Sequence, residues 1–383
     1  MPKTKCRLNH SILLLLIAQI TISDAVKCHD CVGLNCMGSF CEGDYCMVSQ
    51  YAPRWGYLPW IFSTVVKGCV NGSMLAKDIR DHCEYAEGSD EPFTCFCNGK
   101  DLCNTRGKLR NVESEDVELV QCVCDGAHCR TDEKTCIGEF CTYVINHATK
   151  QVEKGCTNAS VPLIERRAIG SCMTPPITGA MHHTIAKDLP NLLPVESCIC
   201  GTDYCNSEKP TPTVPEKEKC TAFIEMTTMG TTMKSRNISC SGEYCFTATI
   251  KSELGIISSY RTLGCASFTG EDPLPEELNP TGCAVFSSEN VEVETCFKTS
   301  DKSAVSRALA SKQIPYKWSL RKYQTLKAKQ MEINEEIKEE EKEKDEEIEE
   351  EEPTQPPIPD DSNTTMITVF VLIIICILGS GIV

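Results

Sequence analysis

The longest apolar runs of the chain lie near its two ends, at residues 12–20 and 366–383. Between them, apolar residues come in short segments that are separated by polar positions and by cysteines. Segments of this length and pattern predict short β-strands and hairpins rather than long helices. The chain therefore divides into a β-rich middle part and two terminal apolar segments.

Two stretches of the middle part have the pattern of a hairpin. In the first, residues 142–145 and 151–153 flank a polar turn at 146–150. In the second, residues 246–250 and 256–260 flank a Glu-Leu-Gly turn. Two β-prone runs around a short polar connection favour antiparallel pairing, so we expect a hairpin at each place.

The first apolar run has the features of a secretory signal. Three basic residues precede it, and Ser23-x-Ala25 follows it as a small-x-small cleavage site. This pattern predicts a signal peptide at residues 1–25 that is removed from the mature protein. The mature chain then folds in an oxidising compartment, where disulfide bonds persist.

The second apolar run, residues 366–383, predicts a membrane anchor. It fits a transmembrane helix of just sufficient length, although no Lys or Arg follows it. It also fits a GPI-anchor signal that follows the small residues Ser362, Asn363 and Thr364. Either alternative tethers the protein to the cell surface, on the extracellular face of the plasma membrane.

Cysteine is the strongest compositional signal, with 28 in the chain and 26 of them between Cys28 and Cys296. One motif, Cys-x-Gly-(Asp/Glu)-(Tyr/Phe)-Cys, begins at Cys41, Cys136 and Cys240, and a Gly-Cys pair follows each copy. Three copies of one motif indicate three copies of one unit. Units of roughly 75 to 85 residues bury too little apolar surface to be stable without covalent bridges.

The repeat defines three cysteine-rich modules: module one (26–104), module two (117–206) and module three (218–302). Modules one and two have ten cysteines each and end in Cys-Asn, whereas module three has six, with Lys298 in place of one cysteine. The missing positions are the second, third, ninth and tenth. Because an even number of cysteines is missing, two whole disulfides are absent from module three, the one between the second and third cysteines and the one between the ninth and tenth. Parity alone leaves the pairing of the six remaining cysteines open.

These residues resemble the three-finger proteins of the Ly6/uPAR type, and more closely the nematode-type ET module, over about residues 26–302. The resemblance implies a small disulfide-rich all-β fold, with three tandem three-finger (snake-toxin/Ly6-like) modules followed by a charged stalk and a C-terminal hydrophobic membrane segment. It also implies thirteen disulfides: Cys28–Cys46, Cys31–Cys36, Cys41–Cys69, Cys83–Cys95 and Cys97–Cys103 in module one; Cys122–Cys141, Cys124–Cys129, Cys136–Cys156, Cys172–Cys198 and Cys200–Cys205 in module two; and Cys220–Cys245, Cys240–Cys265 and Cys283–Cys296 in module three.

One departure from that family concerns the Cys-x-Cys sequences. Ly6 proteins usually have adjacent cysteines where this chain has Cys95 and Cys97. Residues i and i+2 of a strand face the same side, so we expect a local bulge near these two cysteines.

Linkers and a stalk separate and follow the modules. Residues 207–219 form a Pro-rich linker and residues 105–116 a polar one, so we expect the modules to be beads with limited mutual contact. Residues 303–365 form a basic and then acidic stalk, whose composition is compatible with a helix at about 316–350. The segment 332–352 contains 14 acidic residues and only three lysines, so it carries most of the net charge of −16. Charge therefore gives no reason to expect nucleic-acid binding.

Enzymatic chemistry has no motif in this sequence. No catalytic-triad, zinc-protease or phosphate-loop pattern occurs, so we expect no enzyme, no catalytic residue, no cofactor and no metal site. Cys28-His-Asp-Cys31 mimics a redox pair and Cys122-Val-Cys124 mimics half of a zinc knuckle. In an oxidising compartment a structural disulfide is the favoured interpretation of both.

Three glycosylation sequons begin at Asn71, Asn158 and Asn237. The first two occupy the same place in their modules, two residues after the sixth cysteine. A glycan requires an accessible loop, so we expect all three asparagines to face water.

One aromatic cluster in module one is a candidate binding surface. It contains Tyr51, Trp55, Tyr57, Trp60 and Phe62, and the other modules lack it. Trp and Tyr dominate binding hot spots, so Trp55, Tyr57 and Trp60 are the candidate partner-binding residues of a fingertip. The alternative is that these rings pack on the sheet.

The resemblance implies a membrane-tethered extracellular protein-binding or receptor-modulating glycoprotein, with an extracellular or cell-surface protein as its partner. An alternative of a different class is a structural surface-coat glycoprotein without a specific fingertip ligand. A third hypothesis, a secreted inhibitor, requires release from the tether.

Overall fold

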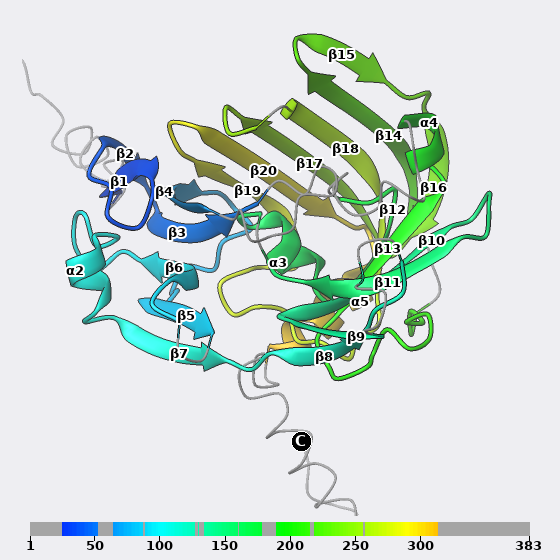
Figure 1. Cartoon of the computed structure of the whole chain (residues 1–383), viewed down its shortest axis with the longest axis horizontal. Coiled ribbons are helices and arrows are strands. Elements are labelled where there is room, and N and C mark those ends of the chain that lie inside the picture. Colours follow the sequence, from blue (N-terminus) through cyan, green and yellow to red (C-terminus); the bar gives the residue numbers. More distant parts are fainter. Residues whose placement is uncertain are drawn as a thin grey trace, which may run out of the picture. The chain divides into compact units, whose positions relative to one another are not determined.

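Short strands dominate the part of the chain that the structure describes (Figure 1). This computed structural model describes residues 25–52, 64–86, 89–126, 129, 134–159, 161–177, 189–214, 218–255 and 257–312. The predicted signal peptide up to residue 24, most of the predicted stalk and the apolar run at 366–383 lie outside these residues. Within the described ranges, no helix has the length and apolar character that crossing a membrane requires.

Modules one and two consist of strands connected by turns and very short helices. Module one and the segment after it contain β1 (Val26–Val32), β2 (Ser39–Gly43), β3 (Tyr45–Tyr51), β4 (Thr64–Asn71), β5 (His82–Ala86), β6 (Pro92–Cys97), α2 (Arg106–Leu109) and β7 (Glu113–Val117). Module two contains β8 (Val120–Val123), β9 (Thr135–Gly138), β10 (Phe140–Asn146), β11 (Val152–Thr157), α3 (Ile164–Ala168), β12 (Ser171–Thr174), α4 (Leu189–Leu192) and β13 (Val195–Cys200).

Module three has the longest strands, and a helix follows it. Its elements are β14 (Glu218–Thr228), β15 (Thr231–Lys234), β16 (Ile238–Gly242), β17 (Tyr244–Ser252), β18 (Ile257–Phe268), β19 (Gly282–Ser287), β20 (Val291–Lys298) and α5 (Lys302–Ser311). Both expected hairpins are confirmed, because β10 pairs antiparallel with β11 and β17 pairs antiparallel with β18.

The same strand order recurs in the three modules. Four strands are antiparallel neighbours in the orders β4-β3-β6-β5, β11-β10-β13-β12 and β18-β17-β20-β19. In each module the last pair is joined by a disulfide between residues that lie directly opposite each other: Cys83 and Cys95, Cys172 and Cys198, and Cys283 and Cys296. The recurring cysteine spacing thus corresponds to a recurring strand arrangement.

The described residues contain thirteen disulfides, which are the same pairs that the resemblance implies. A bulge was expected near Cys95 and Cys97. Both residues lie in regular register with β3, but the register of β6 with β5 shifts just before Cys95, where Glu84 pairs with Thr94 and Tyr85 with Pro92. Cys95 bridges sideways to β5, whereas Cys97, the last residue of β6, bridges to Cys103 in the following turn.

The modules are not separate beads, which corrects the expectation from the linkers. In module two β12 pairs with β18 of module three, and in module three β19 pairs with β4 of module one (Figure 1). The segment between modules one and two is also not a simple linker, because β7 pairs in parallel with β5. One sheet therefore continues through all three modules.

The glycine of the repeated Gly-Cys pair permits these inter-module contacts. A Cβ on Gly68 in β4 would lie 2.3 Å from the carbonyl oxygen of Ser287 in β19, and a Cβ on Gly264 in β18 would lie 2.3 Å from that of Thr174 in β12. Real Cβ atoms do not approach oxygen so closely, so only glycine lets the neighbouring module's strand come this near.

The apolar core is likewise shared. One cluster of buried side chains includes Phe96 from module one, Ile164 and Ile169 from module two, and Phe246 and Phe286 from module three. A core assembled from three modules is larger than any single disulfide-stapled module can form, which lessens the dependence on bridges alone.

Candidate functional site

The three candidate residues of the aromatic cluster lie outside the described part of the chain. Nothing in the described residues tests Trp55, Tyr57 or Trp60 as partner-binding residues, and they stay a prediction. Tyr51, the first ring of the same cluster, ends β3 and is 1% exposed within the shared core. For Tyr51 the alternative interpretation, packing on the sheet, is therefore the correct one.

The repeated Cys-x-Gly-(Asp/Glu)-(Tyr/Phe)-Cys motif forms the same corner in each module. A Cβ on its glycine would lie within 3 Å of the Cβ of the sixth cysteine; the distances are 2.9, 2.8 and 2.9 Å for Gly43, Gly138 and Gly242. The aromatic residue of the motif is buried in every copy, as Tyr45, Phe140 and Tyr244. Glycine and ring are thus packing requirements of the corner.

The acidic residue of the motif fixes the chain that follows the sixth cysteine. In module two, the backbone N–H of Glu139 donates to Oδ1 of Asn158 at 2.9 Å, and Oε2 of Glu139 accepts from the backbone N–H of Ala159 at 2.9 Å. The equivalent residues are Asp44, Asn71 and Gly72 in module one, and Glu243, Ser267 and Phe268 in module three. The acid and its partner therefore have a structural role in all three copies.

This corner changes the interpretation of two sequons. Asn158 is only 4% exposed, contrary to the expectation that it faces water, and Asn71 is half-buried. Their shared position after the sixth cysteine follows from the hydrogen bond that each accepts from the motif acid. Asn237 is exposed, as a glycosylation site requires.

The Cys-Asn endings of modules one and two close each module onto its first strand. Asn104 is fully buried, and its side chain accepts from the backbone N–H of His29 at 2.9 Å and donates to the carbonyl oxygen of His29 at 2.8 Å. Asn206 makes the same pair of bonds with Val123, each at 2.9 Å. The asparagine thus completes the strand pairing beside the last disulfide.

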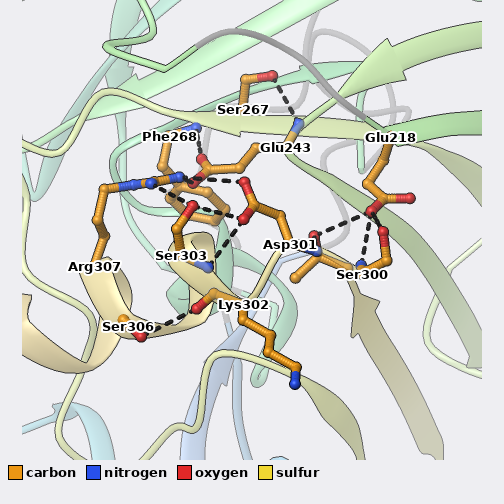
Figure 2. A network of polar contacts seen from close by, with 11 residues as sticks. Glu218, Glu243, Ser267, Phe268, Ser300, Asp301, Lys302, Ser303, Ser306 and Arg307 are labelled. Carbon is orange, nitrogen blue, oxygen red and sulfur yellow. Dashed lines mark hydrogen bonds and ion pairs between the residues drawn. The ribbon is translucent and has the colours of Figure 1, made fainter.

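Module three lacks this ending and closes with a carboxylate instead (Figure 2). Glu218, at the start of β14, accepts from the backbone N–H of Ser300 at 2.7 Å and from the Ser300 hydroxyl. These hydrogen bonds lower the pKa of Glu218 below its ordinary value. The contact joins the first strand to the segment after the last strand, as the Cys-Asn ending does in the other modules.

The helix α5 follows this closure and packs on module three, although all of its residues except Lys302 belong to the predicted stalk. Oδ1 of Asp301 accepts from the backbone N–H of Ser303 at 2.9 Å and caps the helix. Arg307 donates to Glu243 at 2.7 Å (Figure 2). Ala304 is buried in the shared core. The backbone N–H of Leu274 donates to the Ser311 hydroxyl at 3.1 Å, which fixes the other end of the helix.

A buried ion triad joins the three modules. Arg166, in α3 of module two, binds Glu84 of module one at 2.7 and 2.9 Å and Glu277 of module three at 2.5 Å. All three side chains are 1% exposed. Removing Arg166 would leave two carboxylates buried without their counter-charge, which is strongly unfavourable.

A second network lies on a more exposed part of the same junction. Arg80 of module one contacts Glu113 and Glu115 on β7 and Glu276 of module three. Burial raises the pKa of Glu115, and the adjacent Arg80 opposes this effect. Both arginines thus connect strands that are distant in sequence.

The neighbouring Arg167 is a buried cation among aromatic rings. Its guanidinium carbon lies 4.4 Å from the ring centres of Phe268 and Phe297 and 5.3 Å from that of Tyr244. Nη2 donates to the carbonyl oxygen of Pro280 at 2.8 Å, and burial lowers the pKa of Arg167 to about 10. Cation–π contacts replace a paired carboxylate here, and they anchor module two in module three.

Next to Arg167 lies a pocket of about 420 Å³. Its walls come from module two, the 207–219 linker, module three and α5. Apolar side chains line most of it, including Ile169, Phe268, Leu274 and Ala308, while Glu243 and Arg307 provide charge. A mostly apolar pocket of this size with a few polar groups is typical of small-molecule sites.

An exposed apolar side chain lies at the tip of the β14–β15 hairpin. Met229 is 82% exposed, and both turn residues have positive φ, 47° for Met229 and 77° for Gly230. Met233 beside it is also exposed. A non-glycine residue in this backbone region is uncommon, and it is found most often where the surrounding structure or a function requires it.

The sequence analysis missed Arg166, Arg167, Met229 and the pocket. The sequence signal is the short charged run Glu-Arg-Arg between the apolar pairs Leu-Ile and Ala-Ile, because charged residues inside an apolar segment are rarely buried without a partner. The cysteine pairs that mimic redox and zinc motifs are disulfide-bonded to other partners: Cys28 to Cys46, Cys31 to Cys36, Cys122 to Cys141 and Cys124 to Cys129.

No protein-family model matches this chain, and no curated protein matches it in sequence.

Proposed function

We propose that this chain is a membrane-tethered extracellular glycoprotein that recognises another protein, as its likeness to three-finger Ly6/uPAR-type modules implies. The proposal includes the secretory signal and the membrane anchor inferred from the sequence. Three modules held in one unit by disulfides, shared strands and buried arginines favour recognition, because a rigid surface loses little conformational entropy on binding.

The observation that carries the proposal is the tip of the β14–β15 hairpin. Met229 presents a flexible apolar side chain to water, on a turn whose strands are fixed by the buried Ile224 and by the Cys220–Cys245 disulfide. Exposed methionine adapts to apolar pockets of different shapes. The residues around it are uncharged threonines at 227, 228, 231 and 232, which favours a protein surface over an anionic membrane.

The test is capture of neighbours by the full-length protein on living cells. Proximity labelling compares the unchanged protein with Met229→Glu and with Met37→Glu, a matched control because Met37 is 78% exposed in module one. We expect one cell-surface protein to be enriched, and its recovery to fall about tenfold for Met229→Glu and to persist for Met37→Glu.

The surface-coat alternative makes a different prediction for the same experiment. If the protein only forms a coat, the same set of neighbours will be labelled by Met229→Glu, by a Trp55→Ala/Trp60→Ala double variant and by the unchanged protein. That result, at equal surface display, would refute recognition through Met229 and through the aromatic cluster.

A further inference from the structure

The strand β15 forms one edge of the sheet that runs through the modules. Among the described strands it pairs only with β14, in a register that runs from Thr228 opposite Thr231 to Glu225 opposite Lys234 (Figure 1). All four residues of β15 are exposed. An edge strand presents unpaired backbone N–H and C=O groups, which are a template for pairing with another chain.

The backbone groups of Thr232 and Lys234 point away from β14. The N–H of Ser235 donates to the carbonyl oxygen of Ile224 at 2.8 Å, so these two residues form a hydrogen-bonded pair of the hairpin. Hydrogen-bonded and non-hydrogen-bonded pairs alternate along an antiparallel ladder. Met233 therefore bonds to β14, whereas the N–H and C=O groups of Thr232 and Lys234 face outward.

A row of apolar side chains crosses the sheet and ends at this edge. Each member lies directly opposite the next on the neighbouring strand, and towards the edge the order is Phe286, Val293, Ile250, Tyr260, Met226 and Met233. The first four are at most 4% exposed and Met226 is half-buried, whereas Met233 is 39% exposed. The apolar row of the core thus reaches water at Met233.

We propose that β15 pairs antiparallel with β15 of a second copy of this chain, with the two Met233 residues directly opposite each other. In this register the outward N–H and C=O groups of Thr232 meet those of Lys234 in the second copy, and the two-fold symmetry repeats the same contact. The two Met233 side chains then continue the apolar row from one core into the other.

The side chains favour a second copy as the occupant of this edge. In the proposed register each Lys234 faces Thr232 of the other copy, so no like charges are directly opposite. Lys234 pairs with Glu225 of its own hairpin at 3.1 Å, which balances its charge. At the other end of the same sheet, β7 has three acidic residues among five, and pairing with itself would bring like charges together.

The contact is a single short strand, so the association should be weak in solution. It is favoured where copies are concentrated side by side on a cell surface, and in this respect it rests on the proposed membrane tether. It needs no contribution from Met229 at the tip of the hairpin.

The experiment traps the pair as a disulfide in the full-length protein on living cells. Two copies with different tags are expressed together, and surface dimers that carry both tags are measured on non-reducing gels. Met233→Cys should form a disulfide between copies, because opposite residues of a non-hydrogen-bonded pair have Cα atoms about 4.5 Å apart, which a disulfide can span.

Thr231→Cys is the matched control for that variant. It is exposed on the same strand and the same face, but in the proposed register it lies opposite Ser235 of the other copy. The amount of trapped dimer should be about tenfold lower for Thr231→Cys than for Met233→Cys, at equal surface display.

Thr232→Pro tests the backbone pairing itself. It removes an outward N–H and leaves the bonds to β14 intact, and proline is tolerated at such positions of an edge strand. Trapping through Met233→Cys should fall about tenfold when Thr232→Pro is added. Without any new cysteine, energy transfer between two fluorescently labelled copies on the cell surface should also fall for Thr232→Pro.

Two results would overturn the proposal: equal trapping by Met233→Cys and Thr231→Cys, including none by either, or energy transfer that Thr232→Pro leaves unchanged. Surface display reports on the tether separately. Neither result would affect recognition of another protein through Met229, which the Met229→Glu variant tests.

Discussion

Arg166 and Glu84 form a two-point salt bridge, at 2.7 and 2.9 Å, across 82 residues of chain and between two cysteine-rich modules. The same guanidinium reaches Glu277 in the third module. No disulfide joins one module to another among the described cysteines, so this triad, the shared strands and the common core hold the modules together.

Replacing Arg166 with alanine should destabilise the protein by about 3–5 kcal/mol, because Glu84 and Glu277 would remain buried without their counter-charge. The measurement is the free energy of unfolding in denaturant with the disulfides intact. Lys251→Ala is the matched control: its ion pair with Glu292 is exposed, and its loss should cost less than about 1 kcal/mol.

Neutralising the whole triad distinguishes charge from packing. In Arg166→Met/Glu84→Gln/Glu277→Gln no buried charge is left unpaired, so part of the lost stability should return. A triple variant less stable than Arg166→Ala would contradict the assignment of that loss to uncompensated charge.

Gly68→Ala should weaken the contact between modules one and three. Its new Cβ would lie 2.3 Å from the carbonyl oxygen of Ser287, and the backbone shift that relieves this overlap should cost about 1–3 kcal/mol. In Gly107→Ala no atom lies within 4 Å of the new Cβ, and the residue lies in a helix, so stability should stay equal or rise by up to about 1 kcal/mol. Equal unfolding midpoints for both variants would refute the close-approach explanation.

Lys67 predicts a specific dependence of stability on pH. Burial lowers its pKa from 10.5 to about 8, and its ammonium donates to the carbonyl oxygen of Cys36 at 3.3 Å. Between pH 8 and 10.5 the unfolded chain keeps a proton that the folded chain has released, so the free energy of unfolding rises with pH in this window and is constant below it.

Lys67→Met removes that titration. Relative to the variant, the unchanged protein should gain on the order of 2 kcal/mol between pH 8 and 10.5. The comparison is made by denaturant unfolding at several pH values. Parallel pH profiles for the two proteins would show that Lys67 does not titrate in this range.

Glycan occupancy should follow burial. Glycopeptide mass spectrometry of the full-length protein from glycosylating cells should find Asn237 occupied and Asn158 unoccupied, because Asn158 is buried and bonded to Glu139. Ser160→Ala, which removes the second sequon but keeps its asparagine, should leave the mass of the protein's glycans unchanged. A glycan at Asn158 in surface-displayed protein would contradict the hydrogen-bonded corner.

The strand content and both hairpins were predictable because they depend on local signals. The β-prone runs on either side of the polar turn at 146–150 specify β10 and β11 without reference to any other part of the chain. The motif glycine and aromatic ring were also visible, although their role became clear only when Gly43 and Tyr45 were found against the sixth cysteine and in the core.

The assembly of the modules was not predictable in this way. The partners of Arg166 lie 82 and 111 residues away, and no periodicity along the chain reports a contact of that range. The polarity of residues 105–116 indicates a linker, but a third of it belongs to β7, whose alternate residues face the junction and include the buried Glu115. Polar composition hides a strand when its buried residues form ion pairs.

The pairing of β19 with β4 has a consequence for the synthesis of the chain. At this junction the backbone N–H of Cys283 donates a hydrogen bond to the hydroxyl of Ser73, which lies 210 positions earlier in the chain. At about 5–20 residues per second, module one is synthesised roughly 10–40 s before the strand that completes its edge. During that interval the edge is open to other chains, and a product that terminates after module two would keep it open permanently and be prone to aggregate.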